Sequence, residues 1–369
     1  MAVKVLTVPC PWKKAEFSDA ACELWLSRRV TEVVPRSGPC PSAPSRPSRS
    51  DDVVKLVPPG LAPRRGKGGT LASRQAILHS LTHIESWAVD LFWDLVARWG
   101  GDPAYAGLLP TEFFDDIVAG AGEECKHFRL LARRLEETGS RYGALQAHDG
   151  LWHSAAETAH SLAARLAVEH CVHEARGVDV LPQTAERFRS NGDAASHALL
   201  MDTIYPDEIG HCAAGEGPSR APLAPLSRPS PPGRLPGVPG GGPAPDPRLP
   251  RPGPATPAGG PAARLAGRIR PSPSPPSPPP SPPAGVKWLR HLHAAARGMG
   301  GGGAVPAWAA EARRFRTAEK WFHHLVRGHF AGALKGPFNV EAREKAGFLP
   351  GWYEPLADKD YRPAFDDEG

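Results

Sequence analysis

Between Ser73 and Gly215, apolar residues recur every three or four positions along four long segments of the chain. This spacing places them on one face of an α-helix, and few segments show the alternation that is typical of a strand. The four predicted helices span about 73–99, 110–137, 151–178 and 193–215. Four long helices that each have one apolar face predict an all-α four-helix bundle.

The chain as a whole divides into four parts. We expect an N-terminal arm over residues 1–70 with one short helix near 18–34, the bundle over 71–215, an insert over 216–284, and C-terminal helices over 285–369 that complete the bundle domain. The insert is dominated by Pro, Gly, Ser, Ala and Arg. It has almost no large apolar side chains to offset chain entropy, so we expect it to be disordered.

The basic charge of the chain comes from the insert. Its eight arginines against Glu216 and Asp246 give it a net charge of +6, and subtracting this from the chain's +5 leaves −1 for the rest. The folded part therefore gives no strong signal for nucleic-acid binding, which usually needs a basic face.

Other function classes also lack a sequence signal. No apolar run approaches the roughly 18 residues of a membrane span, so we expect no membrane partner. The six cysteines form no paired spacing that indicates a zinc site or a disulfide framework. Reduced thiols suit a cytoplasmic location, and targeting to an organelle has only weak support from the N-terminus.

Two glutamate–histidine pairs on the predicted helices indicate a metal site. Glu124 precedes His127 by three positions on the second helix, and Glu208 precedes His211 by three on the fourth. Residues three apart lie on one helical face, so a carboxylate and an imidazole can reach the same metal pair. Di-metal carboxylate bundles combine two such pairs with a single glutamate from each of two other helices. The candidates for the single glutamates are Glu85 on the first helix and Glu174 on the third.

The level of each residue along its helix supports this choice. Glu85 lies about 14 residues before the end of the first helix and Glu124 about 14 after the start of the second, roughly 21 Å in each case. An antiparallel hairpin would place them at one level. A third pair, Glu157 and His160, lies about 14 residues from Glu174 on the same predicted helix, so we place it on a solvated face.

Further residues near the candidate ligands have weaker support. His83 and Asp90 flank Glu85, and either could support a ligand or lie elsewhere. His170 lies one turn before Glu174 and could orient it, although a solvated histidine fits equally well.

Several sequence runs together resemble a known family. These runs are HIESWAVDL, EFFDDIVAGAGEECKHFRLL, RYGALQAHDGLW, RLAVEHCVHEARGVDV, DEIGHCAAG and GPFNVEAREKAGF. They resemble an uncharacterised ferritin-like family, domain of unknown function 455, over roughly 58–215 and 285–357. The metal-ligand helices are also distantly similar to the di-iron hydroxylase of a modified tRNA adenosine. The resemblance implies a ferritin-like fold and the same six ligands.

The chain departs from this family pattern at three places. Asp90 stands where the family usually has glutamate, and Pro206 precedes DEIGH where an uninterrupted helix is expected. The insert also interrupts what the family has as one continuous helix. Because composition changes abruptly at both edges, our hypothesis is an unspliced intron or a gene-model error, which transcript sequencing would test.

Three functions follow from the six ligands. The leading hypothesis is an O2-dependent oxidoreductase or hydroxylase with two metal ions, iron before manganese. Its substrate would be a small molecule or a modified nucleoside. The alternatives are metal storage with ferroxidase activity, or a non-catalytic helical scaffold. A storage shell requires many subunits, whereas an enzyme could work as a monomer or a homodimer.

Overall fold

A computed structural model describes residues 1–35, 37, 40–213, 284–299 and 305–365, without the side chains of 211–213 and 284. The described residues on both sides of the long gap belong to one compact unit. The predicted disordered insert, 216–284, lies outside the described residues, except that Ala284 begins a helix.

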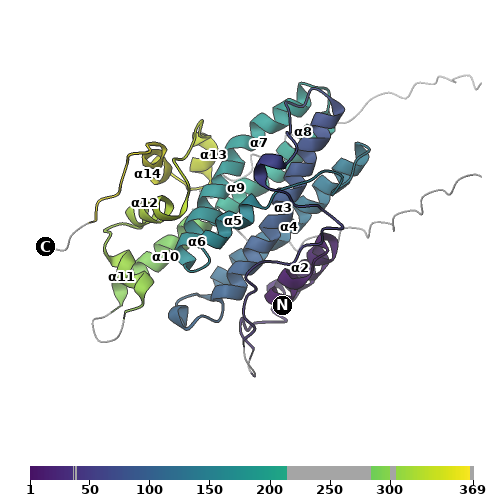
Figure 1. Ribbon diagram of the computed structural model, residues 1–369. Helices are drawn as coiled ribbons and strands as arrows, with labels where there is room; N and C mark the ends of the chain where they lie inside the picture. Colours follow the sequence, from purple (N-terminus) through teal and green to yellow (C-terminus); the bar gives the residue numbers. More distant parts are fainter. Residues whose placement is uncertain (36, 38–39, 214–283, 300–304, 366–369) are drawn as a thin grey trace, which may run out of the picture. The chain divides into compact units, whose positions relative to one another are not determined.

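Helices account for all the regular elements of the described ranges, so the all-α prediction is confirmed for them. The one extended pairing found there is an isolated parallel bridge between Leu56 and Ala147. Figure 1 shows long helices running side by side as a bundle. The described residues therefore form a helical bundle, and its ferritin-like form stays a prediction.

The two longest helices form the predicted antiparallel hairpin. Helix α3 (Leu71–Trp99) begins at Thr70, whose side chain accepts a hydrogen bond from the Ser73 amide, and α4 spans Thr111–Glu137. The Gln75 side chain near the start of α3 donates to the Thr138 carbonyl at the end of α4, over 2.7 Å. A Cβ built on Gly120 of α4 would lie 2.5 Å from the Phe92 ring, so glycine lets the two helices approach closely at mid-length.

The predicted third helix is interrupted. Helix α5 (Gly150–Glu157) ends in a turn, and α6 (Leu162–Ala167) starts anew with the Ser161 side chain accepting from the Ala164 amide. A π-helical segment, η3 (Val168–His173), then leads into α7 (Glu174–Arg189). The prediction of a single helix over 151–178 was therefore wrong, because the chain leaves the helix after Glu157 and a serine cap starts a new one at Leu162.

The fourth predicted helix is continuous through its described part but changes its winding. Helix α8 (Ala194–Ala198) passes through a second π-helical segment, η4 (Leu199–Ile204), into α9 (Tyr205–Ala213). Pro206 lies just after η4. A proline removes an amide donor and crowds the preceding turn, and the wider π winding accommodates both.

The N-terminal arm is more helical than predicted. Helices α1 (Ala2–Thr7) and α2 (Pro11–Leu26) begin earlier than the helix expected near 18–34. The Lys14 ammonium of α2 lies 2.5 Å from Asp90 of α3, and Arg49 also pairs with this buried aspartate. The arm is therefore fixed to the bundle through a buried carboxylate.

The C-terminal segment packs against the bundle. It is helical, as predicted, with two longer helices, α10 (Ala284–Gly298) and α12 (Ala318–His329). It also contains three shorter helices: α11 (Ala307–Arg313), α13 (Val340–Lys345) and α14 (Pro350–Tyr353). Short 3-10 turns occur at 59–61, 103–105 and 354–357.

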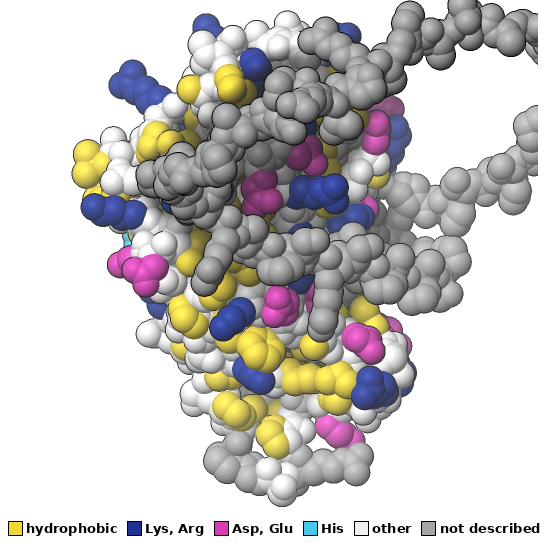
Figure 2. Space-filling model, turned by 90° about the vertical axis from the view of Figure 1, so that its right-hand side faces the viewer, with side chains coloured by type: hydrophobic (Ala, Val, Ile, Leu, Met, Phe, Trp, Pro, Cys, Tyr) yellow, Lys and Arg dark blue, Asp and Glu magenta, His cyan; other side chains and the backbone are white. Residues whose placement is uncertain are grey.

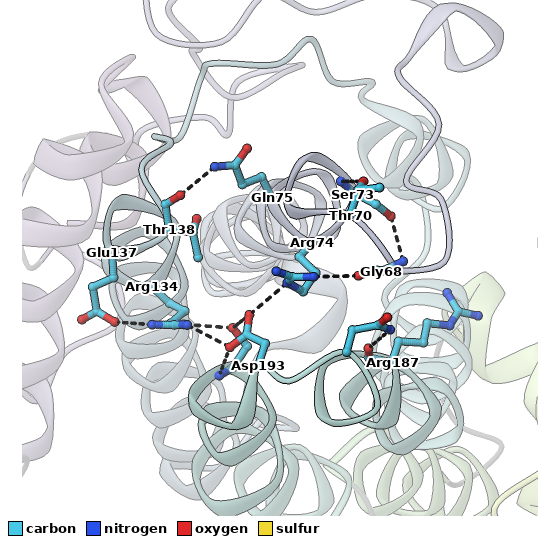
Figure 3. Close-up of polar contacts among 12 residues, drawn as sticks. Gly68, Thr70, Ser73, Arg74, Gln75, Arg134, Glu137, Thr138, Arg187 and Asp193 are labelled. Atoms are coloured by element: carbon cyan, nitrogen blue, oxygen red, sulfur yellow. Dashed lines mark hydrogen bonds and ion pairs between the residues drawn. The ribbon is translucent and has the colours of Figure 1, made fainter.

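A polar network ties helix ends together at one end of the bundle (Figure 3). Asp193, the cap of α8, lies 2.8 Å from Arg134 of α4 and 3.7 Å from Arg74 of α3. The same Arg74 donates to the Gly68 carbonyl in the loop before α3. These contacts hold α3, α4 and α8 in a fixed register.

The surface carries mixed charge. Figure 2 shows basic side chains next to acidic ones over the visible part of one face. Across the described ranges, no helix has both the length and the apolar character needed to cross a membrane.

Candidate metal centre

Four of the six predicted ligands come together inside the bundle. Their side-chain donor atoms lie within 4.8 Å of one another, and all four residues are buried. They come from three helices: Glu85 from α3, Glu124 and His127 from α4, and Glu208 from α9. The Nδ1 atom of His127 lies 3.7 Å from Glu124, 3.7 Å from Glu208 and 3.9 Å from Glu85. We call these four residues the carboxylate cluster.

Of the remaining two predicted ligands, Glu174 alone has a described side chain. Glu174 begins α7 and is half-buried, and its charge acts on Glu85. His211 lies on α9, but its side chain is outside the described ones. Gly177, one turn after Glu174, leaves room for a ligand, because a Cβ there would lie 3.3 Å from Oε2 of Glu208.

Each π-helical segment ends within four residues before a candidate ligand. Segment η3 ends at the residue before Glu174, and η4 ends four residues before Glu208. A π turn rotates every later side chain about the helix axis, and such turns are frequent at functional sites. The sequence periodicity had not predicted either segment.

Burial of several acids together raises the pKa of Glu85 well above its usual value. The largest cause is loss of solvent, followed by the charge of Glu124 and a hydrogen bond shared with it, and then the charges of Glu208 and Glu174. Like charges in a dry site cannot all ionise, so without a cation part of the cluster must hold protons.

The environment of His127 also raises its pKa, although by a different balance of causes. Burial alone lowers the pKa of this imidazole, but hydrogen bonds to Asp207 and Glu124 outweigh it and raise the pKa to about 9. A proton on His127 therefore offsets part of the negative charge of the cluster. A metal ion would replace this proton.

Asp207 is a site residue that sequence reasoning missed. Its carboxylate accepts a hydrogen bond from Nε2 of His127 over 3.1 Å and lies 2.7 Å from the Lys126 ammonium. Burial raises the pKa of Asp207, but these two partners lower it to about 2. The carboxylate fixes the ring so that Nδ1 faces the cluster, as in many metal sites. Its position directly before Glu208 was the only signal in the sequence.

The predicted neighbours of the cluster have other roles. Asp90 pairs with Lys14 and Arg49 instead of supporting a ligand. His83 is buried between the Tyr142 hydroxyl, 2.8 Å away, and the His148 carbonyl, 3.0 Å away. His170 is buried rather than solvated, with its ring 4.9 Å from that of Phe92.

The composition of the cluster separates it from structural ion pairs elsewhere in the protein. Three other buried aspartates each face an arginine or lysine: Asp90 with Lys14, Asp94 with Arg165, and Asp179 with Arg343. The buried Glu169 accepts from Ser154 and lies 3.8 Å from His173, as a single acid. The carboxylate cluster instead gathers three acids around one imidazole.

This donor set fits hard divalent metals. Carboxylate oxygens with few imidazoles suit iron or manganese. Two ions in shared sites lie roughly 3.5–4 Å apart. Glu85, Glu124, His127 and Glu208 could hold such ions, with Glu174 beside them. The cluster is therefore a candidate metal site.

Replacing Asp207 by alanine is expected to weaken metal binding about 10- to 100-fold, because His127 loses the acceptor that orients its ring. Titration of the purified variant with Fe²⁺ or Mn²⁺ measures this. Asp202, an exposed acid on η4, provides the control: its replacement by alanine should leave the affinity unchanged. Equal affinity in the two variants would contradict the role of Asp207.

The raised pKa values predict opposite pH responses for stability and for metal binding. The pKa of His127 rises from 6.5 to about 9 on folding, so its contribution to stability is complete below pH 6.5 and is lost as pH rises through 9. Glu85, also raised, acts in the same sense. The metal-free protein should thus be less stable at pH 9 than at pH 6, on the order of 1 kcal/mol or more.

Metal binding should instead tighten over this pH range, because the ligands must lose protons first. Urea unfolding of metal-free protein and Mn²⁺ titrations at pH 6, 7.5 and 9 test both responses. Stability that rises with pH together with flat affinity would contradict the proposed protonation of the cluster.

Comparison with known proteins gives two matches. The family model described as "Protein of unknown function (DUF455)" matches residues 7–218. This range covers Glu85, Glu124, His127, Glu174, Glu208 and His211 but not the C-terminal segment. An uncharacterized protein of Haemophilus influenzae is 36% identical over 160 residues, 43% of this chain. The chain covers 55% of that relative's length. No solved structure matches.

Proposed function

The chain belongs to the DUF455 family, whose model matches more than half of it, and we propose from its own candidate site that it is a ferritin-like di-metal carboxylate oxidoreductase. The metal would be iron, with manganese as the second choice, and the reaction would use dioxygen. One observation carries the proposal: three buried carboxylates, from three helices, and one imidazole bring their donor atoms within 4.8 Å of one another.

A structural role explains this arrangement poorly. Bringing several acids into a dry interior raises the free energy of the folded protein unless a cation or protons compensate. A purely structural core would be more stable with apolar residues at these positions. The arrangement becomes favourable when divalent ions occupy it.

The residues of the chain prepare such a site in three ways. Helices α3, α4 and α9 place the carboxylates on facing surfaces, and Asp207 orients the ring of His127. The bundle buries these residues, which excludes bulk water. When bound, two iron ions would supply the redox chemistry with dioxygen that amino acid side chains lack.

Oxygen consumption tests the proposal. The full-length protein is loaded with Fe²⁺ without oxygen, mixed with a reductant, and followed with an oxygen electrode. We expect consumption that exceeds that of the Glu124→Gln variant and of an equal amount of free Fe²⁺. If the loaded protein consumes oxygen no faster than these controls, the oxidoreductase proposal is wrong.

The same preparation distinguishes the proposed enzyme from a metal-storage protein. A storage protein would form a large shell and retain many ferric ions per chain, whereas the proposed enzyme would retain about two. Light scattering gives the subunit number, and a monomer or dimer would support the enzyme. The substrate class, a small organic molecule or a modified nucleoside, would then be sought by screening for substrate-stimulated oxygen consumption.

A further inference from the structure

A second group of histidines and glutamates lies where the C-terminal segment meets the bundle. His160, in the turn after α5, faces His329, the last residue of α12, with ring centroids 5.1 Å apart and planes inclined by 54°. Nearly 170 residues separate these histidines in the sequence, so their meeting is a product of the fold. None of the candidate ligands of the carboxylate cluster belongs to this pair.

Further donors surround this pair. Glu157, the last residue of α5, lies three positions before His160, and both are exposed. On the other side, His324 of α12 lies 3.0 Å from Glu311 of α11. The charges of Glu157 and Glu311 both act on His329. Two carboxylates and a third imidazole thus lie around the two facing rings.

The residue types suit a metal ion, because histidine is the commonest protein ligand for zinc-class ions. Two imidazoles with nearby carboxylates are such a ligand set.

The spacing of the two rings fits one tetrahedral ion. With metal–nitrogen bonds of about 2.0–2.1 Å, each ring centroid would lie about 3.2 Å from the ion, and tetrahedral geometry would separate the centroids by about 5.2 Å. The observed separation is 5.1 Å. The separation of the two rings is therefore compatible with one ion between them, and binding requires the three side chains to turn their donor atoms toward it.

We propose that His160, His329 and Glu157 bind one divalent ion of the zinc class at a site separate from the carboxylate cluster. The ion joins the turn after α5 to the end of α12, and so holds the C-terminal helix on the bundle. Water completes its coordination. The site assigns a role to the third glutamate–histidine pair, and it does not depend on the proposed oxidoreductase activity.

Zinc titration of the full-length chain tests the proposal. The Glu124→Gln variant is used as the background, because it disables the carboxylate cluster and leaves the second site intact. We expect this protein to bind one Zn²⁺ per chain. Adding His160→Ala or His329→Ala should weaken the affinity at least tenfold, and adding Glu157→Gln should weaken it less. His153, an exposed histidine of α5 beside Asp149, is the control, and its replacement by alanine should change nothing.

Thermal unfolding provides a second readout. Zn²⁺ should raise the melting temperature of the Glu124→Gln background but not that of the variant that also lacks His160. Because His160 is exposed, its removal leaves the core intact. Zinc affinity that survives both histidine substitutions, or weak binding that never saturates at one ion, would mean an adventitious ion only and would overturn the proposal.

Discussion

Replacing Glu124 by glutamine is expected to abolish two-metal binding and, at the same time, to stabilise the metal-free protein. Glutamine keeps the size of the side chain but removes a charge from a cluster that also contains Glu85 and Glu208. The metal ions lose a central carboxylate ligand. The metal-free protein loses a repulsion that raises the pKa of Glu85 well above its usual value. The expected gain is on the order of 1 kcal/mol.

These two effects together separate a metal site from a structural ion pair. If the attraction between Glu124 and protonated His127 outweighed this repulsion, replacing Glu124 would lower stability, since the buried imidazolium would lose a compensating charge. Elemental analysis and urea unfolding of the metal-free protein measure the two effects. Glu136→Gln, at an exposed position of α4, is the matched control and should change neither. A Glu124→Gln protein that is less stable and keeps its metals would refute our interpretation.

Replacing Arg343 by methionine is expected to cost about 3–5 kcal/mol of stability, because it leaves a buried charge without its partner. Arg343 of α13 donates to both carboxylate oxygens of Asp179 on α7, over 2.8 and 2.6 Å. Its guanidinium also lies over the ring of Tyr353, 4.3 Å from the centroid. Methionine fills much of the same space but provides neither hydrogen bond.

The pair with Asp179 is part of a larger junction between the C-terminal segment and the bundle. Asn339, the cap of α13, donates through its backbone to Asp179 and through its side chain to the Tyr205 hydroxyl. Helices α7 and α9 begin with Glu174 and Tyr205, respectively, so this junction fixes two helices that carry candidate ligands. We therefore expect Arg343→Met also to weaken metal binding.

Urea unfolding measures the effect of Arg343→Met, and two further variants sharpen it. Adding Asp179→Asn to Arg343→Met should recover part of the lost stability, because the unpaired charge is removed. Lys345, which pairs with Glu341 on the exposed side of α13, serves as the control, and its replacement by alanine should cost less than about 1 kcal/mol. If Arg343→Met loses as little stability as the Lys345 variant, then the proposed role of this junction is wrong.

The sequence predicted the α3–α4 half of the site well because the signal there is local. The helix boundaries and the antiparallel hairpin together fix the level of each residue, so counting residues was enough to pair Glu85 with Glu124. The structure places both at the carboxylate cluster. Gly100 and Gly101 end the first helix near the predicted position, which kept this count accurate.

The other half was harder to predict because its helices are irregular. Periodicity assumes regular winding, whereas η3 and η4 insert π turns and the Ser161 cap starts a new helix. Each change rotates the later side chains about the helix axis, and the angle cannot be calculated from the spacing of residues in the sequence. The partnership of Asp207 with His127 was equally hidden, because it joins α9 to α4 and depends on how these helices pack.

The C-terminal motif shows a different limit. The run GPFNVEAREKAGF was noticed only as a resemblance, and no periodicity predicted helix α13 within it. Its Asn339 and Arg343 act through contacts with residues more than 130 positions earlier in the chain. Such contacts become visible only in the folded structure.

The most direct test of the central claim is the metal content of the full-length protein, purified without oxygen and supplied with Fe²⁺ or Mn²⁺. Elemental analysis is expected to give about two iron or manganese ions per chain, and about none at this site in Glu124→Gln. If a folded preparation takes up neither metal in stoichiometric amount, then the carboxylate cluster is not a metal site, and a non-catalytic helical scaffold becomes the better account.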